Sequence, residues 1–385
     1  MRLTTFAGIA LLAVAACSPD GGSGPAGATG GVSGSGGQGG GTGGTSPGTG
    51  GSGTGGAGTG GVTPGTGGVP ADASAGDTPA AQDAPVDSPP ATGPVAPVMR
   101  NLHYAFDIGD VTFEIDPQIG GRVTTLSIGQ SGNLLTGPAV NPTYWGSTMW
   151  TSPESDWPQP PPAQIDSAPF TVSTTATSVT VTGPTVTDAT PPAMVATSAL
   201  LGLSLSKTFS ADRRGTIQID YKITNHKTGN ARVAPWEVTR VFTGGVTFFP
   251  TGSRTMLTKG STLPTTTTGG ITWFTYDQAA ITADSKLIAD GAEGWMAHVD
   301  KGLLFIKKFG DVPAAQIAPN EGDTEIYTNK LHTYIEMEDQ GAYATMAPGA
   351  TTTWTVTWYL RRLPAGVMGT AGEAALIQFV RDTIK

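Results

Sequence analysis

A short acidic segment near the C-terminus has the residue types and spacing best suited to chemistry. Residues 331–343 read LHTYIEMEDQGAY, in which every second position is polar or aromatic: His332, Tyr334, Glu336, Glu338 and Gln340. Because successive side chains of a β-strand point to opposite faces, this spacing predicts one polar face and one apolar face. Carboxylates two residues apart on a strand lie about 7 Å from each other, a separation suited to acid–base work or to binding hydroxyl groups. A solvated sheet face is the alternative interpretation of both glutamates.

The histidine of this segment is the best placed of the four in the chain. His332 shares the predicted face with both glutamates, and a neighbouring carboxylate favours the charged imidazole that can donate a proton. Reaching the same ligand as Glu338 would require a bend in the chain, so a structural role for His332 stays open. The catalytic candidates are therefore Glu338, Glu336 and His332.

A second set of candidates lies in residues 141–162, a stretch rich in Pro, Ser and Asn without its own periodicity. Aromatic rings can stack on the C–H faces of sugars, while amide groups read the hydroxyls. A loop of this length is more often functional than not. The alternative is that the tryptophans pack as core at the end of a sandwich. The candidate sugar-binding residues of this stretch are Asn141, Tyr144, Trp145, Trp150 and Trp157.

The strand expected at 234–241, APWEVTRV, continues the same predicted pocket. Trp236 and Arg240 are expected to face the ligand, and Glu237 could supply a carboxylate opposite the late acidic strand. The alternative for Glu237 is a buried salt bridge to Arg240 or Arg122, and Arg122 is itself a candidate substrate-binding residue.

The elements that must position these residues are almost all β-strands. Stretches that alternate apolar with polar residues, rich in Val, Ile, Thr, Tyr and Trp, occur at 110–117, 122–129, 170–184, 199–210, 216–225, 302–310 and 351–360. Helical spacing is seen only at the C-terminus, where Thr370 and Glu373 can form a capping box. A dozen or more strands in one domain predict an all-β fold of two antiparallel sheets packed face to face, with a short C-terminal helix.

The chain before this region has a different composition. Residues 1–17, MRLTTFAGIALLAVAAC, have the layout of a secretory signal, and VAAC resembles a bacterial lipobox that would lipidate Cys17, the one cysteine of the chain. An ordinary signal peptide is the alternative. Residues 18–97, rich in Gly, Ser, Thr and Pro, are predicted to form a disordered tether. We therefore expect a single domain at 98–385, attached by lipid to a bacterial membrane and facing the periplasm or the exterior.

Composition excludes several other functions. Without Arg2 and the five aspartates before residue 98, the chain keeps 20 basic and 25 acidic residues, and this acidic balance argues against a nucleic-acid partner. No zinc signature, phosphate-binding glycine loop or Gly-x-Ser-x-Gly elbow is present, so no cofactor and no metal are expected. An acidic turn could hold calcium, but its spacing does not match an EF-hand; its oxygen-bearing residues are Asn320, Asp323, Glu325 and Asn329.

Four stretches in this order carry a family resemblance: GGRVTTLSIGQSGNLL (120–135), NPTYWGSTMWTSPESDWPQPPP (141–162), APWEVTRV (234–241) and HTYIEMEDQGAY (332–343). Together they resemble the galactose mutarotase-like, or aldose 1-epimerase-like, β-supersandwich, and in particular a family of bacterial secreted proteins with that fold. The resemblance spans nearly all of 98–364. It implies a fold that hosts epimerases, lyases and sugar binders alike.

The resemblance also implies roles. Mutarotases use a late-strand carboxylate, in a pattern like Leu-Glu-x-Gln, to take the proton of the anomeric hydroxyl, while a histidine protonates the ring oxygen. Residues 337–340, MEDQ, fit that pattern, which points to Glu338 as general base with Glu336 as the fallback. The strand at 235–240 lacks the family histidine. We therefore expect a carbohydrate-binding protein, with an aldose 1-epimerase-type enzyme as the alternative and a polysaccharide lyase or hydrolase third.

Overall fold

The computed structural model describes residues 92–157, 159–187 and 199–385. The expected signal segment at 1–17, its Cys17, and residues 18–91 of the expected tether lie outside the described residues. Within the described part, no helix is long and apolar enough to span a bilayer.

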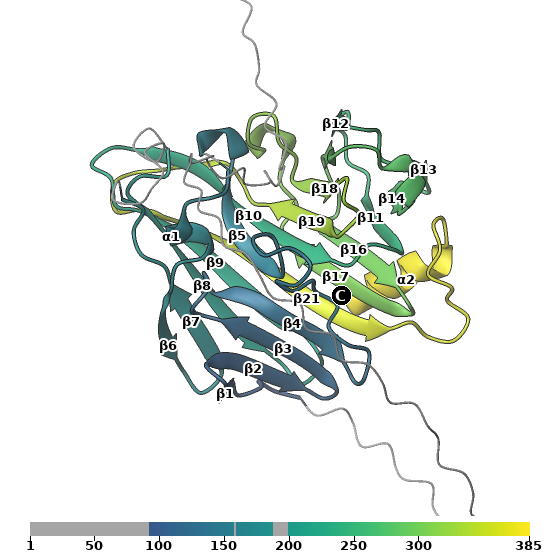
Figure 1. Ribbon diagram of the computed structural model, residues 1–385, viewed down its shortest axis with the longest axis horizontal. Coiled ribbons are helices and arrows are strands. Elements are labelled where there is room, and N and C mark those ends of the chain that lie inside the picture. Colours follow the sequence, from purple (N-terminus) through teal and green to yellow (C-terminus); the bar gives the residue numbers. More distant parts are fainter. Residues whose placement is uncertain (1–91, 158, 188–198) are drawn as a thin grey trace, which may run out of the picture. The chain divides into compact units, whose positions relative to one another are not determined.

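The described residues form two large antiparallel sheets, here called sheet A and sheet B (Figure 1). In spatial order, the strands of sheet A are β1 (Val98–Arg100), β2 (His103–Ile108), β3 (Val111–Asp116), β4 (Arg122–Ile128), β5 (Ser147–Ser152), β10 (Ala231–Val241), β19 (Ile335–Gln340), β18 (Thr324–Thr328), β15 (Ser285–Ala289) and β12 (Leu257–Lys259), with β20 (Ala344–Met346) paired to β10. The strands of sheet B are β13 (Thr265–Thr268), β14 (Ile271–Thr275), β11 (Val246–Pro250), β16 (Trp295–Asp300), β17 (Leu303–Phe309), β21 (Thr351–Arg362), β9 (Ile217–Asn225), β8 (Leu203–Ala211), β7 (Ser178–Thr182) and β6 (Thr171–Thr174). The helices are α1 (Ala163–Asp166) and α2 (Ala374–Thr383), with short 3-10 turns η1 (Glu154–Asp156), η3 (Gln278–Ala280) and η4 (Ala314–Gln316).

The two-sheet architecture and the C-terminal helix predicted from the sequence are confirmed. The stretch at 170–184 is a hairpin, β6 and β7, and the stretch at 199–210 becomes a strand only from Leu203. Packing also begins before residue 98, because the Val95 side chain is buried and its amide donates to the Ala211 carbonyl at 2.8 Å.

The space between the sheets holds a core of aromatic and branched residues. The Trp358 ring lies edge-on to Phe113 of sheet A and Phe305 of sheet B, with ring centroids 5.8 and 4.9 Å away. A second apolar cluster lies on the far side of sheet B, where α2 packs Leu376 and Val380 against β11, β16 and β17. Burying these faces is what holds the sheets and the helix together.

Exposure differs between strands in a way that matters for function. Strands β9 and β21 of sheet B alternate between buried and exposed residues, as strands with one solvated face do. The central strands of sheet A, β5, β19, β18 and β15, are buried at every position, and β10 at all but one. The side of these strands that faces away from sheet B is therefore also shielded from solvent, although it carries charged residues.

Candidate functional site

The register between β10 and β19 gathers the predicted residues. Trp236 lies opposite Gln340, and Arg240 lies opposite Glu336, with Glu338 between them on β19. Directly opposed residues of an antiparallel pair project on the same face. These five side chains therefore share the side of sheet A that faces away from sheet B, which we call the outer polar face. Strand β5 adds Thr148 and Trp150 to this face, β18 adds Glu325 and β15 adds Lys286.

Glu338 lies at the centre of the outer polar face. Its Oε2 accepts hydrogen bonds from Trp236 Nε1 at 3.0 Å and from Lys286 Nζ at 2.8 Å. Lys286 also pairs with Glu325 at 2.6 Å and lies 4.5 Å from the centre of the Trp236 ring. Burial raises the pKa of Glu338 to about 7; Lys286 opposes the shift and the charge of Glu325 adds to it. The group is thus poised to exchange a proton near neutral pH.

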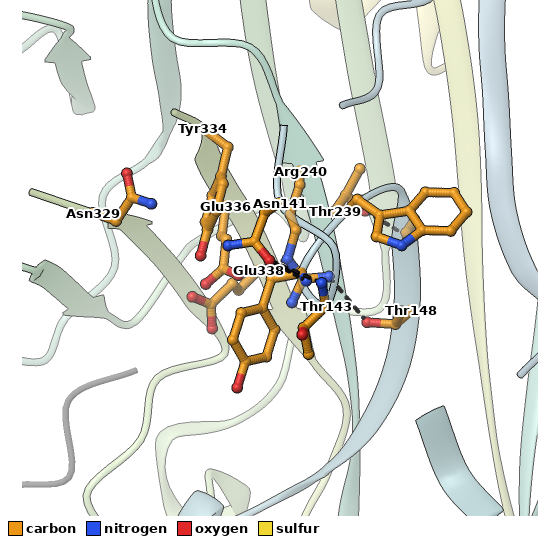
Figure 2. Close-up of polar contacts among 12 residues, drawn as sticks. Asn141, Thr143, Thr148, Thr239, Arg240, Asn329, Tyr334, Glu336 and Glu338 are labelled. Atoms are coloured by element: carbon orange, nitrogen blue, oxygen red, sulfur yellow. Dashed lines mark hydrogen bonds and ion pairs between the residues drawn. The ribbon is translucent and has the colours of Figure 1, made fainter. Parts of the chain in front are cut away.

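Glu336 forms the second charged pair of this face. Its Oε1 accepts from Arg240 Nε at 2.8 Å, and Arg240 Nη1 donates to Thr148 Oγ1 at 3.3 Å. Figure 2 shows Arg240 held between Glu336 and Thr148. Burial raises the pKa of Glu336 to about 7, Arg240 opposes this, and the charge of Glu338 raises it further. The charge of Glu338 thus affects the pKa of Glu336 on the same face.

Aromatic residues pack around these charged residues. The Trp150 ring lies edge-on to Trp236 and to Trp157, with centroids 5.4 and 5.6 Å away, and 6.2 Å from Tyr144. The Arg240 guanidinium lies 4.9 Å from the Trp150 ring centre. The stretch at 141–162 is therefore not one loop as predicted, because residues 147–152 form β5 and place Trp150 on the outer polar face.

The remaining predicted residues of this stretch lie at the margin of the face. Asn141 Oδ1 accepts from the amides of Thr143 and Tyr144 at 2.9 and 2.8 Å and so shapes the turn beside Arg240, as Figure 2 shows. Arg122 Nη1 donates to the Trp145 carbonyl at 2.9 Å, and its guanidinium lies 4.7 Å from that indole. The ligand-binding roles of these residues stay predictions.

Asp166 of α1 joins this margin to the aromatic residues of the outer polar face. One carboxylate oxygen accepts from Arg122 Nη2 at 3.0 Å, and the other accepts from Trp150 Nε1 at 2.8 Å. Sequence reasoning missed this residue and also Lys286. The signal for Lys286 was a lone cation directly before the apolar run LIA in the strand SKLIA at 285–289.

Glu237 does not lie on the outer polar face, so its predicted placement was wrong. It is an odd-numbered neighbour of Trp236 and projects between the sheets, opposite Asp339. There it accepts from Trp358 Nε1 at 2.9 Å and pairs with Lys307 at 2.8 Å, while Tyr221 also donates to it. The cation of this buried bridge is thus Lys307 of sheet B, neither Arg240 nor Arg122.

His332 is also placed differently from the prediction. Its φ of 57° belongs to a turn, and β19 begins three residues later at Ile335. The alternation therefore holds for Glu336, Glu338 and Gln340 but does not extend to the histidine. Tyr334, one residue before the strand, lies beside Glu336 in Figure 2.

Several buried polar atoms of the outer polar face have no hydrogen-bond partner among the described residues. They are Glu338 Oε1, Arg240 Nη2 and both amide atoms of Gln340. Buried polar atoms are nearly always paired, and a cluster of unpaired ones points to an external partner such as a ligand.

Two residues of the acidic turn considered for calcium form hydrogen bonds with backbone amides of the protein. Asp323 Oδ1 accepts from the Gly291 amide, and Glu325 Oε1 accepts from the Gly322 amide, both at 2.6 Å. In the described ranges, no three His, Cys, Asp or Glu side chains are grouped to hold a metal ion.

Comparison with known proteins returned one family and a set of solved structures. The model of a family described as a domain of unknown function, DUF4380, matches residues 104–361, and a search of curated proteins returned no match. A galactose mutarotase-like protein from Lactobacillus casei is 13% identical over 67% of this chain and 100% of its own, with a TM-score of 0.48. One from Clostridium acetobutylicum is 12% identical over 68% and 95%, with a TM-score of 0.45. A galactose mutarotase related enzyme from Lactobacillus acidophilus is 9% identical over 69% and 99%, with a TM-score of 0.46. These descriptions name the group that the sequence motifs resemble; likeness at this level says nothing of activity.

Proposed function

The chain belongs to the DUF4380 family, a domain of unknown function, and on the geometry of its outer polar face we propose that it binds a carbohydrate there. The observation that carries this proposal is the set of unpaired buried atoms on Glu338, Arg240 and Gln340. Together they can accept hydrogen bonds at Glu338 Oε1 and Gln340 Oε1, and donate them from Arg240 Nη2 and Gln340 Nε2.

A sugar matches this mixture better than an ion does. Each sugar hydroxyl both donates and accepts a hydrogen bond, so one ring can satisfy neighbouring donors and acceptors together. Trp150 and Trp236 are buried beside these groups, and they would offer apolar surface to the C–H face of a ring once the residues that cover them shift. The two cations of this face, Arg240 and Lys286, are already paired with Glu336, Glu338 and Glu325, so neither is left to bind an anionic ligand.

Entry of a ligand requires movement. Glu338 and Arg240 are fully buried, so residues that cover the outer polar face must shift before a sugar can reach them. Association that waits for such a change is slower than docking into an open cleft. Slow binding with a change in tryptophan fluorescence is therefore expected, because Trp150 and Trp236 line the face.

A glycan array followed by calorimetry tests the proposal. We expect the protein to retain a subset of array glycans, and Glu338→Gln or Arg240→Lys to weaken binding of the best one at least about ten-fold, since each removes or misplaces a pairing group. The matched control is Glu293→Gln, which changes an exposed carboxylate that pairs with Arg381 on α2. An array without any retained glycan contradicts the proposal, and so does unchanged affinity in both site variants.

Epimerase activity at the same face is the second candidate. It is favoured by the two carboxyls whose pKa is about 7, because near neutral pH one can be protonated while the other is ionised. In ring opening of an aldose, the anomeric hydroxyl and the ring oxygen are bonded to one carbon, so an acid and a base on one strand can serve both. Fresh α-glucose or α-galactose should then reach rotational equilibrium faster with the protein, and Glu338→Gln should abolish the acceleration. A wild-type rate equal to the buffer rate rules out epimerisation of these sugars and leaves binding intact.

We also propose that the protein is a lipoprotein of a bacterial cell envelope, facing the periplasm or the exterior. The support is the sequence VAAC at 14–17 and the Gly-rich stretch that follows. A Cys17→Ser chain should move from the membrane fraction to the soluble fraction, and the wild-type N-terminal peptide should carry a diacylglycerol mass. Wild-type chain recovered only in the soluble fraction contradicts the anchor.

A further inference from the structure

A cavity lies beside the outer polar face. It has a volume of about 690 Å³ and is lined by residues of β2 to β4, of segment 137–145 and of α1, among them His103, Asp116, Arg122, Thr143, Trp145 and Asp166. This volume falls in the range of pockets that hold small ligands. The ion pairs of Glu336 and Glu338 do not involve His103 or Asp116.

One layer of side chains separates this cavity from the outer polar face. Asp166 lines the cavity, where it pairs with Arg122, and its other oxygen accepts from Trp150 of the outer polar face. Segment 137–145 is shared in the same way: Thr143 lines the cavity, whereas the ring of Tyr144 lies 5.5 Å from the Arg240 guanidinium. A ligand that extends past this segment would occupy both places.

The cavity has the composition of a neutral sugar site. Trp145 offers an indole stacked on Arg122, and the imidazole of His103 lies 3.4 Å from the Asp116 carboxylate. Arg122 pairs with Asp166 and His103 lies next to Asp116, so no cation that lines the cavity lacks a carboxylate beside it to attract an acidic sugar instead. Arg122 Nε is buried without a hydrogen-bond partner among the described residues, which leaves a donor for a ligand oxygen.

The geometry points to a second sugar subsite in this cavity, so that the ligand of the protein is a neutral oligosaccharide. This inference rests on the proposed carbohydrate binding at the outer polar face and adds the size and charge of the ligand. One unit pairs with Glu338 and Arg240, and the next stacks beside Trp145 within reach of His103.

Calorimetry on matched glycans tests the subsite. The probes are the best-retained oligosaccharide of the glycan array and its terminal monosaccharide. We expect the oligosaccharide to bind at least about ten-fold more tightly, which corresponds to about 1.4 kcal/mol. His103→Ala should reduce this advantage to less than about three-fold and leave monosaccharide affinity unchanged. Trp145→Ala should also remove the advantage if a thermal melt shows that this variant is folded. If it is not folded, the result for His103→Ala alone decides the test. His226→Ala, an exposed histidine that contacts Ser204, is the matched control.

The outcomes separate this inference from the proposed function. Equal affinity for both probes, or an advantage that survives in His103→Ala, overturns the subsite and leaves carbohydrate binding in place. Retention of only acidic glycans overturns the neutral ligand. An array without any retained glycan overturns both proposals.

Discussion

Replacement of Glu338 by glutamine tests whether the outer polar face is maintained at a cost in stability. Burial raises the pKa of this carboxyl from 4.5 to about 7. A carboxyl with a higher pKa in the folded chain than in the unfolded chain stabilises the fold below its unfolded-state pKa, and that contribution is lost as the pH rises through the folded-state pKa. The window is therefore pH 4.5 to about 7. At about 1.4 kcal/mol per pKa unit, the loss attributable to Glu338 between pH 5 and pH 8 is about 2–3 kcal/mol.

The glutamine variant removes this titration with little change in shape. Its amide oxygen can still accept from Trp236 Nε1, and Lys286 keeps Glu325 at 2.6 Å. Because the charge of Glu338 also raises the pKa of Glu336, that group should titrate at a lower pH in the variant and weaken the pH dependence further. Between pH 5 and pH 8, we therefore expect the free energy of unfolding of Glu338→Gln to fall by about 2–3 kcal/mol less than that of the wild type.

Urea unfolding followed by tryptophan fluorescence at pH 5, 6, 7 and 8 measures this difference. Glu293→Gln is the control. Its hydrogen bond with Arg381 lowers the pKa of Glu293, so its contribution is present above pH 4.5 and is lost only as the pH falls further. This control should keep the wild-type loss between pH 5 and pH 8. The reasoning is refuted if Glu338→Gln loses as much free energy of unfolding over this range as the wild type does.

Two further predictions concern the interior and a turn. Lys307→Met should lower the free energy of unfolding by about 3–5 kcal/mol, because it leaves the buried carboxylates of Glu237 and Asp339 without their cation. Adding Glu237→Gln and Asp339→Asn should restore much of the lost stability. Urea midpoints measure this, and a triple variant no more stable than Lys307→Met would contradict the prediction. In thermal melts, Gly120→Ala should lower the free energy of unfolding by about 2 kcal/mol or more beyond the loss for Gly109→Ala. Both glycines have φ near 65°, but only at Gly120 would a Cβ lie 1.9 Å from a backbone oxygen of α1. Equal losses would show that the structure relaxes around this contact without cost.

Local patterns account for much of the architecture. The alternation at 216–225 and 351–360 predicted strands with one buried face, and β9 and β21 have that pattern. The same period placed Glu336, Glu338 and Gln340 on a common face, because side-chain direction in a strand depends only on the parity of the residue number. A period of two also separates Glu237 from Trp236, so its inward orientation was readable from the sequence.

Tertiary structure decided what that common face became. Trp236 and Glu338, 102 residues apart in the chain, meet only through the pairing of β10 with β19, and Lys286 joins them from β15. The sequence alone determined the two sheets, the C-terminal helix and the parity of each side chain, since these depend on neighbours along the chain. Which strands adjoin, which cation pairs with each buried acid, and whether a polar face meets water depend on contacts between distant segments, and no local period encodes them.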